Sequence, residues 1–512
     1  MSTYISTICG TSVSHIETKA ETKGEISMNS NTLSTVENVN GIYEIPSELK
    51  KQWNGLLVEG AAGLKVKIKG KKGEERLVPD RALTNGRFIL NFDPALKGKF
   101  EYEVMTCRVM VERNSLPWDK DTPLTDNSYG VITGPGYGNH RPLTDEDLTE
   151  LRLYLSNNYD YEIGKKDALS IVRSEGILNR WNYFTKYIES LPSWDGKKRL
   201  GSLFHDYLGA EASELNEQIA VKTLVAVIAR AFSDYPVKYD YMPILCGKQG
   251  IGKSLLLQRL AGVGLNDSIN TFEGKTAEEQ IQGKILAEVQ EMEAFSKSSI
   301  NRIKQFLTKN IDNYRKPYAV NANDFLRRTV FVGTTNDAHC LTDTSGNRRF
   351  LPVDCNVTEK LFNVYEDLTA EVVDAIWAEA YDCYKNGERL LIDESFWESL
   401  YTAQEEHRQK NPWEEIIEEY LDIAIPADWY DMTIEQQISW MDHPCRTDET
   451  VKRSKVSIEE IWTVCLKQKR GDFGKNVAHS RTIASILNTL PGWNKQKVRY
   501  GKRVVTGAQR TL

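Results

Sequence analysis

The stretch Gly247-Lys-Gln-Gly-Ile-Gly-Lys-Ser254 decides the fold of this chain. One glycine, four intervening residues and then Gly-Lys-Ser is the spacing of loops that wrap nucleotide phosphates. Glycines let the backbone turn closely around the phosphates, and amides at the start of the following helix point at them. The apolar run Met242–Cys246 predicts a buried strand before the loop, and Leu255–Leu260 predicts a helix after it. The pattern therefore predicts an α/β core that binds nucleotide phosphates.

Two side chains of this loop have specific predicted roles. We expect Lys253 to reach the terminal phosphates of ATP and Ser254 to give an oxygen to Mg²⁺. The backbone of the whole segment is expected to surround the nucleotide: Gly247, Lys248, Gln249, Gly250, Ile251, Gly252, Lys253, Ser254 and Leu255.

Acidic residues end the next apolar strand, which starts 31 residues after Ser254 with Ile285-Leu-Ala-Glu288. Hydrolysis needs one carboxylate for Mg²⁺ and another group to activate water. We assign Glu288 to the metal and Glu291 to the water. The two roles could be exchanged, and Glu293 is a third acid nearby. The alternative is an exposed acidic helix start, where glutamate is also favoured.

A third apolar strand, Thr329–Val332, runs into Gly333-Thr-Thr-Asn336. An asparagine at such a strand end can orient the attacking water, although asparagine is also common where a strand turns. The segment Asn347-Arg348-Arg349 begins eleven residues later, before another apolar strand. Either arginine could reach the γ-phosphate bound by a neighbouring subunit, as arginine fingers do. The alternative is a surface pair bound to carboxylates.

Basic and aromatic residues mix around a predicted hairpin near Val320–Asn323. This mixture suits the phosphates and bases of single-stranded DNA, and a purely structural hairpin is the alternative. The candidate DNA contacts here are Arg315, Lys316, Arg327 and Arg328.

The charge of the chain changes sign near its carboxyl end. Residues 401–450 carry a net charge of about −10 and residues 451–512 about +11, within a total of −7. Two helices and the pair of strands around Tyr500-Gly501 give the outline of a winged helix. Such a basic module could meet DNA phosphates, or it could dock on protein. Its candidate DNA contacts are Lys497, Arg499, Lys502 and Arg503.

Composition places the chain in a broad class. Apolar residues make up 40% and charged residues 27% of 512 residues, as in ordinary globular proteins. No apolar run is long enough to span a membrane, no secretory signal begins the chain, and eight scattered cysteines form no Cys-x-x-Cys pair. We therefore expect a protein of the bacterial cytoplasm, with no membrane partner. Alternating runs such as Leu64–Lys69 predict half-buried strands near the amino end.

The predicted domains follow these patterns. They are a disordered segment at 1–40, an α+β domain at 41–165, a helical collar for oligomerisation at 166–235, the ATPase core at 236–358, a helical extension at 359–425, an acidic linker at 426–452, and a basic winged-helix-like DNA-binding domain at 453–512.

The order of these motifs resembles superfamily 3 helicases of the AAA+ class, and more closely the virulence-associated E family. The resemblance spans roughly residues 85–420. It is carried by Asn91–Pro94, Leu116–Trp118, Trp194–Leu200, Gly247–Ser254, Glu288–Glu293, Asp312–Tyr318, Gly333–Asp337 and Gly346–Phe350. The acidic motif departs from the family by lacking adjacent acids, and the hairpin lacks a Lys-His pair.

The resemblance implies an ATP-dependent DNA helicase that initiates replication of a phage or pathogenicity-island-type mobile element. It implies a ring, usually of six subunits, with single-stranded DNA in its channel and a double-stranded origin bound by the carboxyl-terminal domain. Asn336 is similar to the family's sensor residue. No paired-carboxylate or zinc pattern precedes the loop, so we expect a separate primase partner. The rival functions are an ATP-switched origin-binding scaffold and a P-loop kinase.

Overall fold

The computed structural model describes residues 37–39, 42–60, 64–71, 74–119, 138–291, 297–315, 321–341, 347–409, 411–442, 450–473, 477–500 and 503–511. The segment predicted to be disordered, 1–40, lies outside these residues except for 37–39. Contacts divide the chain into two compact units. One is Met1–Tyr102 with Val109–Gly130 and His140–Asn179, and the other is Glu103–Arg108 with Val131–Asn139 and Arg180–Leu512.

The first unit packs helices around short strands. Its elements are mainly β1 (Glu37–Val39), β2 (Ile42–Glu44), α1 (Ser47–Glu59), β3 (Val66–Lys69), β4 (Arg76–Pro79), α2 (Leu83–Phe92), β5 (Glu101–Glu103), β6 (Arg108–Glu112), β7 (His140–Pro142), α3 (Asp145–Tyr159) and α4 (Lys165–Leu178). A capping box between Thr144 and Asp147 starts α3. The predicted strand at Leu64–Lys69 is present as β3, but it is not half-buried, because Ile68 is 66% exposed.

The second unit holds a parallel sheet, as the sequence predicted, and this sheet has five strands. Its strands lie in the order β10 (Leu265–Asn266), β11 (Leu286–Val289), β14 (Val330–Thr335), β9 (Met242–Cys246), β15 (Phe350–Asp354). All residues of β9, β11 and β14 are buried, because helices cover both faces of the sheet.

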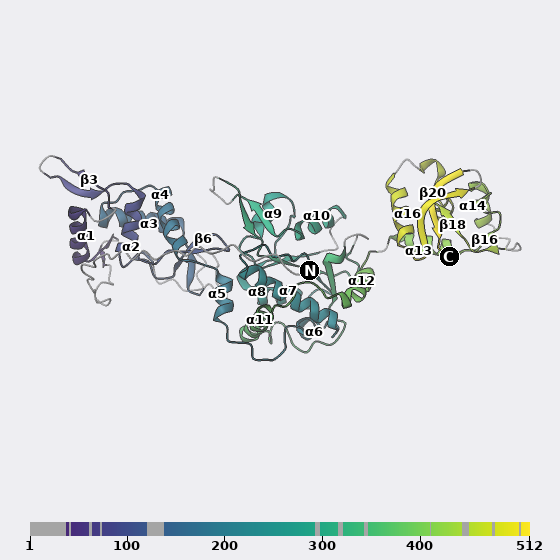
Figure 1. The fold of residues 1–512 in the computed structure, drawn as a ribbon, viewed down its shortest axis with the longest axis horizontal. Coiled ribbons are helices and arrows are strands. Elements are labelled where there is room, and N and C mark those ends of the chain that lie inside the picture. The colour runs from purple at the N-terminus through teal and green to yellow at the C-terminus, as the bar shows by residue number, and fades with distance from the viewer. Residues whose placement is uncertain are drawn as a thin grey trace, which may run out of the picture. The chain divides into compact units, whose positions relative to one another are not determined.

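Helices of the second unit lie on the two sides of this sheet (Figure 1). On one side, α9 (Gly274–Gln280) and α10 (Lys297–Leu307) share a hydrophobic core with the strands. On the other side lie α7 (Glu214–Phe232), α8 (Lys253–Ala261) and α11 (Ala370–Lys385). The remaining elements around the sheet are β8 (Arg180–Trp181), α5 (Tyr183–Ser190), α6 (Leu203–Leu208), β12 (Ile311–Tyr314), β13 (Asn323–Leu326), α12 (Trp397–Glu406) and the 3-10 turns Gly262–Gly264, Asn347–Arg349 and Glu394–Phe396.

A separate hydrophobic core organises the last hundred residues. Its elements are α13 (Pro412–Asp422), β16 (Ile425–Pro426), α14 (Ile434–Asp442), β17 (Thr450–Val451), β18 (Lys455–Ser457), α15 (Ile458–Glu460), the π-helix Ile461–Cys465, the 3-10 turn Arg470–Asp472, α16 (Val477–Thr489), β19 (Trp493–Tyr500) and β20 (Arg503–Arg510). The three-stranded sheet β18-β20-β19 is antiparallel. The predicted order of helix, helix and basic pair of strands is present.

The acidic stretch at 426–452 is not a bare linker. Trp429 within it is fully buried in the carboxyl-terminal core, and its indole donates to Glu460 at 2.9 Å. Helix α13, which we assigned to the preceding helical extension, supplies Ile417 and Tyr420 to the same core. The carboxyl-terminal module therefore starts near residue 412. Net acidic charge misled the prediction because the charges lie on the surface of packed elements.

No helix among the described residues is long and apolar enough to cross a membrane.

Candidate functional site

A tight loop joins β9 to α8 at the carboxyl edge of the parallel sheet. Gly250 and Gly252 have φ angles of +82° and +103°, which side chains other than glycine rarely tolerate. A Cβ on Gly252 would also come within 3.0 Å of Val364. Because Gly252 caps α8, the loop brings the amides of the first turn of that helix toward its own centre. This is the backbone arrangement that binds anions.

Lys253 closes the loop from inside. Its side chain is mostly buried, and its ammonium donates to the carbonyl oxygens of Gly247 and Lys248, the latter at 3.0 Å. It also donates to Oδ1 of Asn336 at 3.3 Å. The structure therefore brings together the lysine and the asparagine that the sequence placed 83 residues apart.

Ser254 and Glu288 meet directly beside this lysine. Glu288 is fully buried in β11, and its Oε1 accepts hydrogen bonds from Ser254 Oγ at 2.5 Å and from Thr334 Oγ1 at 2.8 Å. Its Oε2 accepts a bond from Gln290 at 3.2 Å. A hydroxyl and a carboxylate are the oxygen ligands that Mg²⁺ prefers, and Mg²⁺ keeps several waters besides one or two carboxylates. Ser254 and Glu288 thus fit a magnesium ion.

Glu291 lies just beyond the end of β11. It is exposed and has a φ of +51°, an uncommon backbone conformation for a residue other than glycine. Such conformations gather at functional sites. Glu293 lies outside the described residues. Of the two glutamates whose roles we left open, Glu288 is the one that contacts the serine, which favours Glu288 as the metal ligand and leaves Glu291 free to face water.

Arg348 and Arg349 lie in the 3-10 turn directly before β15. In the parallel register, Phe350 pairs with Met242 and Asp354 with Cys246. The arginines are therefore at the amino end of the sheet, whereas the phosphate loop leaves its carboxyl end. Met242 and Cys246 are four residue steps apart, so these ends are separated by about 13 Å at roughly 3.3 Å per residue. Arg348 is exposed, and Nε of Arg349 lies 3.8 Å from Oδ2 of Asp240.

The predicted hairpin exists as β12 paired antiparallel with β13. Arg315 follows β12 and is exposed, which suits the predicted DNA contact, and Lys316 lies outside the described residues. Arg328 is partly buried and donates to backbone carbonyls at the end of α7, including that of Ser233 at 2.7 Å. Arg328 therefore holds the hairpin to the core.

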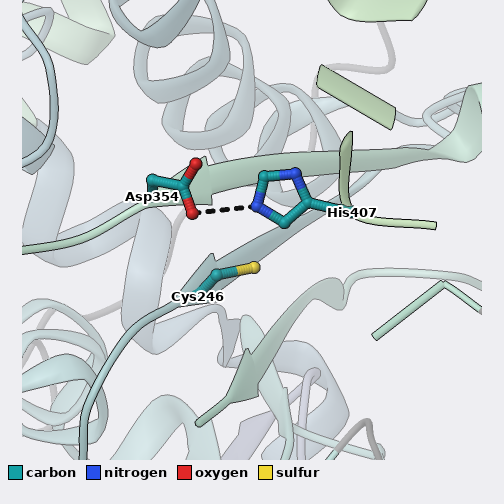
Figure 2. A group of neighbouring side chains, drawn as sticks. All are labelled: Cys246, Asp354 and His407. Carbon is teal, nitrogen blue, oxygen red and sulfur yellow. Dashed lines mark hydrogen bonds and ion pairs between the residues drawn. The ribbon is translucent and has the colours of Figure 1, made fainter. Parts of the chain in front are cut away.

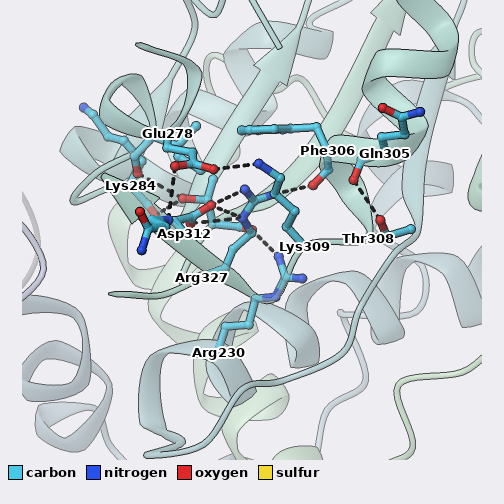
Figure 3. Close-up of polar contacts among 12 residues, drawn as sticks. Arg230, Glu278, Lys284, Gln305, Phe306, Thr308, Lys309, Asp312 and Arg327 are labelled. Carbon is cyan, nitrogen blue, oxygen red and sulfur yellow. Dashed lines mark hydrogen bonds and ion pairs between the residues drawn. The ribbon is translucent and has the colours of Figure 1, made fainter. Parts of the chain in front are cut away.

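Arg327 does not have the exposure that a DNA contact requires. Its side chain is fully buried and forms a salt bridge with Asp312, while its Nη1 donates to Phe306 O at 2.5 Å (Figure 3). Lys309 and Glu278 form a second ion pair beside it at 2.6 Å. The prediction for Arg327 is corrected by this burial: the residue anchors the base of the hairpin, because an ion pair satisfies its charge away from water.

The basic side chains of the last two strands are exposed. Lys497 and Arg499 lie on one face of β19, and Arg503 begins β20. Lys502 lies outside the described residues. Their exposure is compatible with the predicted DNA contact, which stays a prediction.

Three residues that support the loop had no role in the sequence analysis. Thr334 holds the carboxylate of Glu288, Lys360 donates to the carbonyl of Ile251 at 2.6 Å, and Val364 packs against Gly252. Thr334 belongs to the strand-end motif before Asn336, so its position was a usable signal. Lys360 and Val364 follow β15 in an irregular segment, where no periodic pattern marks a contact.

Comparison with known proteins gives one family match. Residues 188–409 match the model of the virulence-associated protein E-like domain. This range contains the whole parallel sheet, the phosphate loop and the hairpin. The match confirms the resemblance to the virulence-associated E family for residues 188–409 of the predicted span of roughly 85–420.

Solved structures are only distantly similar. The apo structure of the NrS-1 C-terminal region (305–718) is 13% identical with a TM-score of 0.43, over 80% of this chain and 96% of that chain. An A-form apo structure of the same region is 11% identical with a TM-score of 0.43, over 83% and 99%. No curated protein matches the chain.

Proposed function

Because residues 188–409 form a virulence-associated protein E-like domain, we propose that this protein is an ATP-dependent DNA helicase that initiates replication of a phage or pathogenicity-island-type mobile element. The observation that carries this proposal is the cluster at the sheet edge. There, Ser254 Oγ donates to Glu288 Oε1 at 2.5 Å, and Lys253 Nζ donates to Asn336 Oδ1 at 3.3 Å. Both contacts lie beside a glycine-rich loop of the kind that binds nucleotides. We infer that this core is a P-loop ATPase of the AAA+ class.

Each residue of the cluster has a role in phosphoryl transfer to water. The ammonium of Lys253 would leave the loop carbonyls for the terminal phosphates and neutralise the charge that develops there. Ser254 and Glu288 would hold Mg²⁺, which would supply positive charge to stabilise the negative charge of the phosphates. Asn336 and Glu291, both exposed at the same edge, would orient and activate the water.

The position of the arginines supports a site shared between subunits. Arg348 and Arg349 lie about one strand length, roughly 13 Å, from the loop of their own chain. They would therefore serve the nucleotide of a neighbour in a ring, which we propose to be a hexamer. Hydrolysis would move the β12–β13 hairpins along single-stranded DNA.

The carboxyl-terminal module supports a second, separate DNA contact. Lys497, Arg499 and Arg503 are exposed on its pair of strands, and a duplex phosphate backbone would attract them. We propose that this module is a winged-helix-like domain that binds the origin. We further propose that primers come from a separate primase. Robust primer synthesis by the purified chain would contradict that part of the proposal.

The decisive experiment measures unwinding of a forked DNA by the purified chain with ATP and Mg²⁺. Lys253→Ala should abolish strand separation and ATP turnover, and the surface variant Lys275→Ala is a matched control that should retain both, because Lys275 is exposed on α9. Unwinding that persists in Lys253→Ala would refute the proposal. If DNA does not stimulate ATP turnover and a small molecule is phosphorylated, the result would point to a kinase. DNA binding and assembly without unwinding would point to a scaffold.

A mixing experiment tests the shared site. Arg349→Ala and Lys253→Ala subunits should each be inactive alone. Mixed rings should regain part of the hydrolysis, because some interfaces combine an intact loop with an intact arginine. No recovery in rings shown to be mixed would exclude action across the interface, and the same test with Arg348→Ala assigns the finger.

A further inference from the structure

Three potential metal ligands lie close together at the carboxyl ends of β9 and β15 (Figure 2). Cys246 is the last residue of β9, Asp354 is the last residue of β15, and His407 follows α12 directly. Their ligand atoms, one from each residue, all lie within 4.8 Å of one another. The parallel register pairs Asp354 with Cys246. Three distant segments of the chain thus converge on one point.

The imidazole of His407 is oriented as in metal-binding histidines. Its Nδ1 lies 2.7 Å from the carbonyl oxygen of Ala403, and a carbonyl can only accept, so Nδ1 carries a hydrogen. Its Nε2 faces Asp354 Oδ1 at 2.9 Å and points into the cluster. Metal-ligating histidines almost always donate their other ring nitrogen to such a partner, which fixes the ring.

A second buried thiol, that of Cys340, belongs to a segment that pairs with the residues after His407. Leu341 pairs with Arg408 in an isolated parallel bridge, which keeps the neighbouring Cys340 and His407 together. One thiol, one imidazole and one carboxylate therefore surround the same point, and all three are ligand types that zinc takes.

We propose that Cys246, Asp354 and His407 bind Zn²⁺ or a similar soft divalent cation, with solvent in the fourth position of a tetrahedral site. With bonds of about 2.0–2.2 Å to nitrogen and oxygen, tetrahedral geometry separates these two atoms by about 3.3 Å. His407 Nε2 and Asp354 Oδ1 are 2.9 Å apart, so they would need to separate by only about 0.4 Å to bind the metal.

An ion can reach this site from solvent. Asp354 is 48% exposed at its side chain, while that of His407 is 5% exposed. Both residues line a hollow of about 920 Å³, together with Pro352, Thr402 and Ala403. A bound metal would tie β9, β15 and α12 together immediately before Gly247. Its role would be to fix the strand from which the phosphate loop starts, and the site does not depend on nucleotide hydrolysis.

Metal titration of the full chain tests this site. The protein is stripped with a chelator under reducing conditions and titrated with Co²⁺, then with Zn²⁺. We expect one Co²⁺ per chain, with a sulfur-to-cobalt charge-transfer band and tetrahedral visible bands that Zn²⁺ abolishes. Cys246→Ser and His407→Ala should weaken binding by more than the roughly 10–100-fold that loss of an outer-shell partner costs.

Controls separate this site from general thiol binding and from misfolding. Cys383→Ser removes a free thiol on α11 outside the cluster and should leave the spectrum unchanged. Asp354→Asn changes a half-exposed side chain and remains informative if the buried cysteine variant does not fold. The proposal fails if the wild-type chain binds no Co²⁺ or if the ligand variants bind it like the wild type.

Discussion

Shortening Arg327 to alanine should open the β12–β13 hairpin rather than merely weaken a DNA contact. The guanidinium is fully buried, its Nε lies 3.1 Å from each carboxylate oxygen of Asp312, and its centre lies 4.1 Å from the ring centroid of Phe306. The variant would leave Asp312, itself only 6% exposed, charged and unpaired.

The size of the effect follows from that burial. Breaking a buried ion pair by removing one partner costs about 3–5 kcal/mol, because the remaining charge stays out of water. Since about 1.4 kcal/mol corresponds to a factor of ten, the open state of the hairpin should become roughly a hundred to a few thousand times more populated. Removing both partners should cost less than removing the arginine alone.

Amide hydrogen exchange followed by mass spectrometry measures this locally. Peptides that cover Ile311–Tyr314 and Asn323–Leu326 should exchange faster in Arg327→Ala by about that factor, up to the limit set by global unfolding. In Asp312→Ala/Arg327→Ala the acceleration should be smaller. The matched control is Arg315→Ala, which removes an exposed arginine next to β12 and should leave exchange unchanged.

The reverse pattern would refute this reasoning. If Arg327→Ala exchanged like the wild type and lost affinity for single-stranded DNA, the arginine would be a DNA contact after all. Conversely, loss of DNA affinity in Arg315→Ala with unchanged exchange would place the contact at the exposed position.

Three other perturbations test separate parts of the molecule. Glu288→Gln should lower steady-state ATP turnover by at least about a hundredfold while equilibrium binding of a fluorescent ATP analogue persists, because it removes the charge that Mg²⁺ needs; equal loss of binding would contradict a metal role. Arg499→Ala should reduce the slope of log affinity for duplex DNA against log salt by about 0.9, the value for one phosphate contact, and an unchanged slope would exclude that contact. Burial raises the pKa of Asp147, but hydrogen bonds and charge from Arg141 outweigh it, so its pKa is lowered overall. A carboxyl group with a depressed folded pKa stabilises the fold above its unfolded pKa of about 3.9 and loses that contribution as pH falls through the folded value. Acid unfolding of the first unit, followed by hydrogen exchange of peptides that cover α3, should therefore steepen below about pH 4 in the wild type and flatten in Asp147→Asn.

Local signals carried most of the prediction of the core. The strand before the phosphate loop, the glycines and the following helix are encoded within some twenty residues, from Met242 to Ala261. Each of these elements forms mainly through contacts between residues that are close in the sequence. The carboxyl ends of parallel strands lie at one edge, so Glu288 and Asn336 could be expected near Lys253 once the strands were found.

Long-range pairing could not be predicted in the same way. Asp312 lies in one strand of the hairpin and Arg327 directly follows the other. A charged residue is predicted to be exposed to solvent unless its partner is known. Cys246, Asp354 and His407 are separated by 108 and 53 residues, as single residues without metal-ligand spacing. Trp429 lies in an acidic stretch whose charge hid its buried position. In each case tertiary contacts, rather than local pattern, decide the environment.

The direction of β15 is the part of the fold that bears most on function. Its carboxyl end carries Asp354 beside the phosphate loop, and its amino end follows Arg348 and Arg349. A parallel strand cannot bring both ends to one nucleotide, because it is extended and rigid between them. If these arginines act in hydrolysis, a second copy of the chain must therefore supply them. The mixing experiment with Lys253→Ala and Arg349→Ala consequently tests a requirement of the strand's direction as well as a family resemblance.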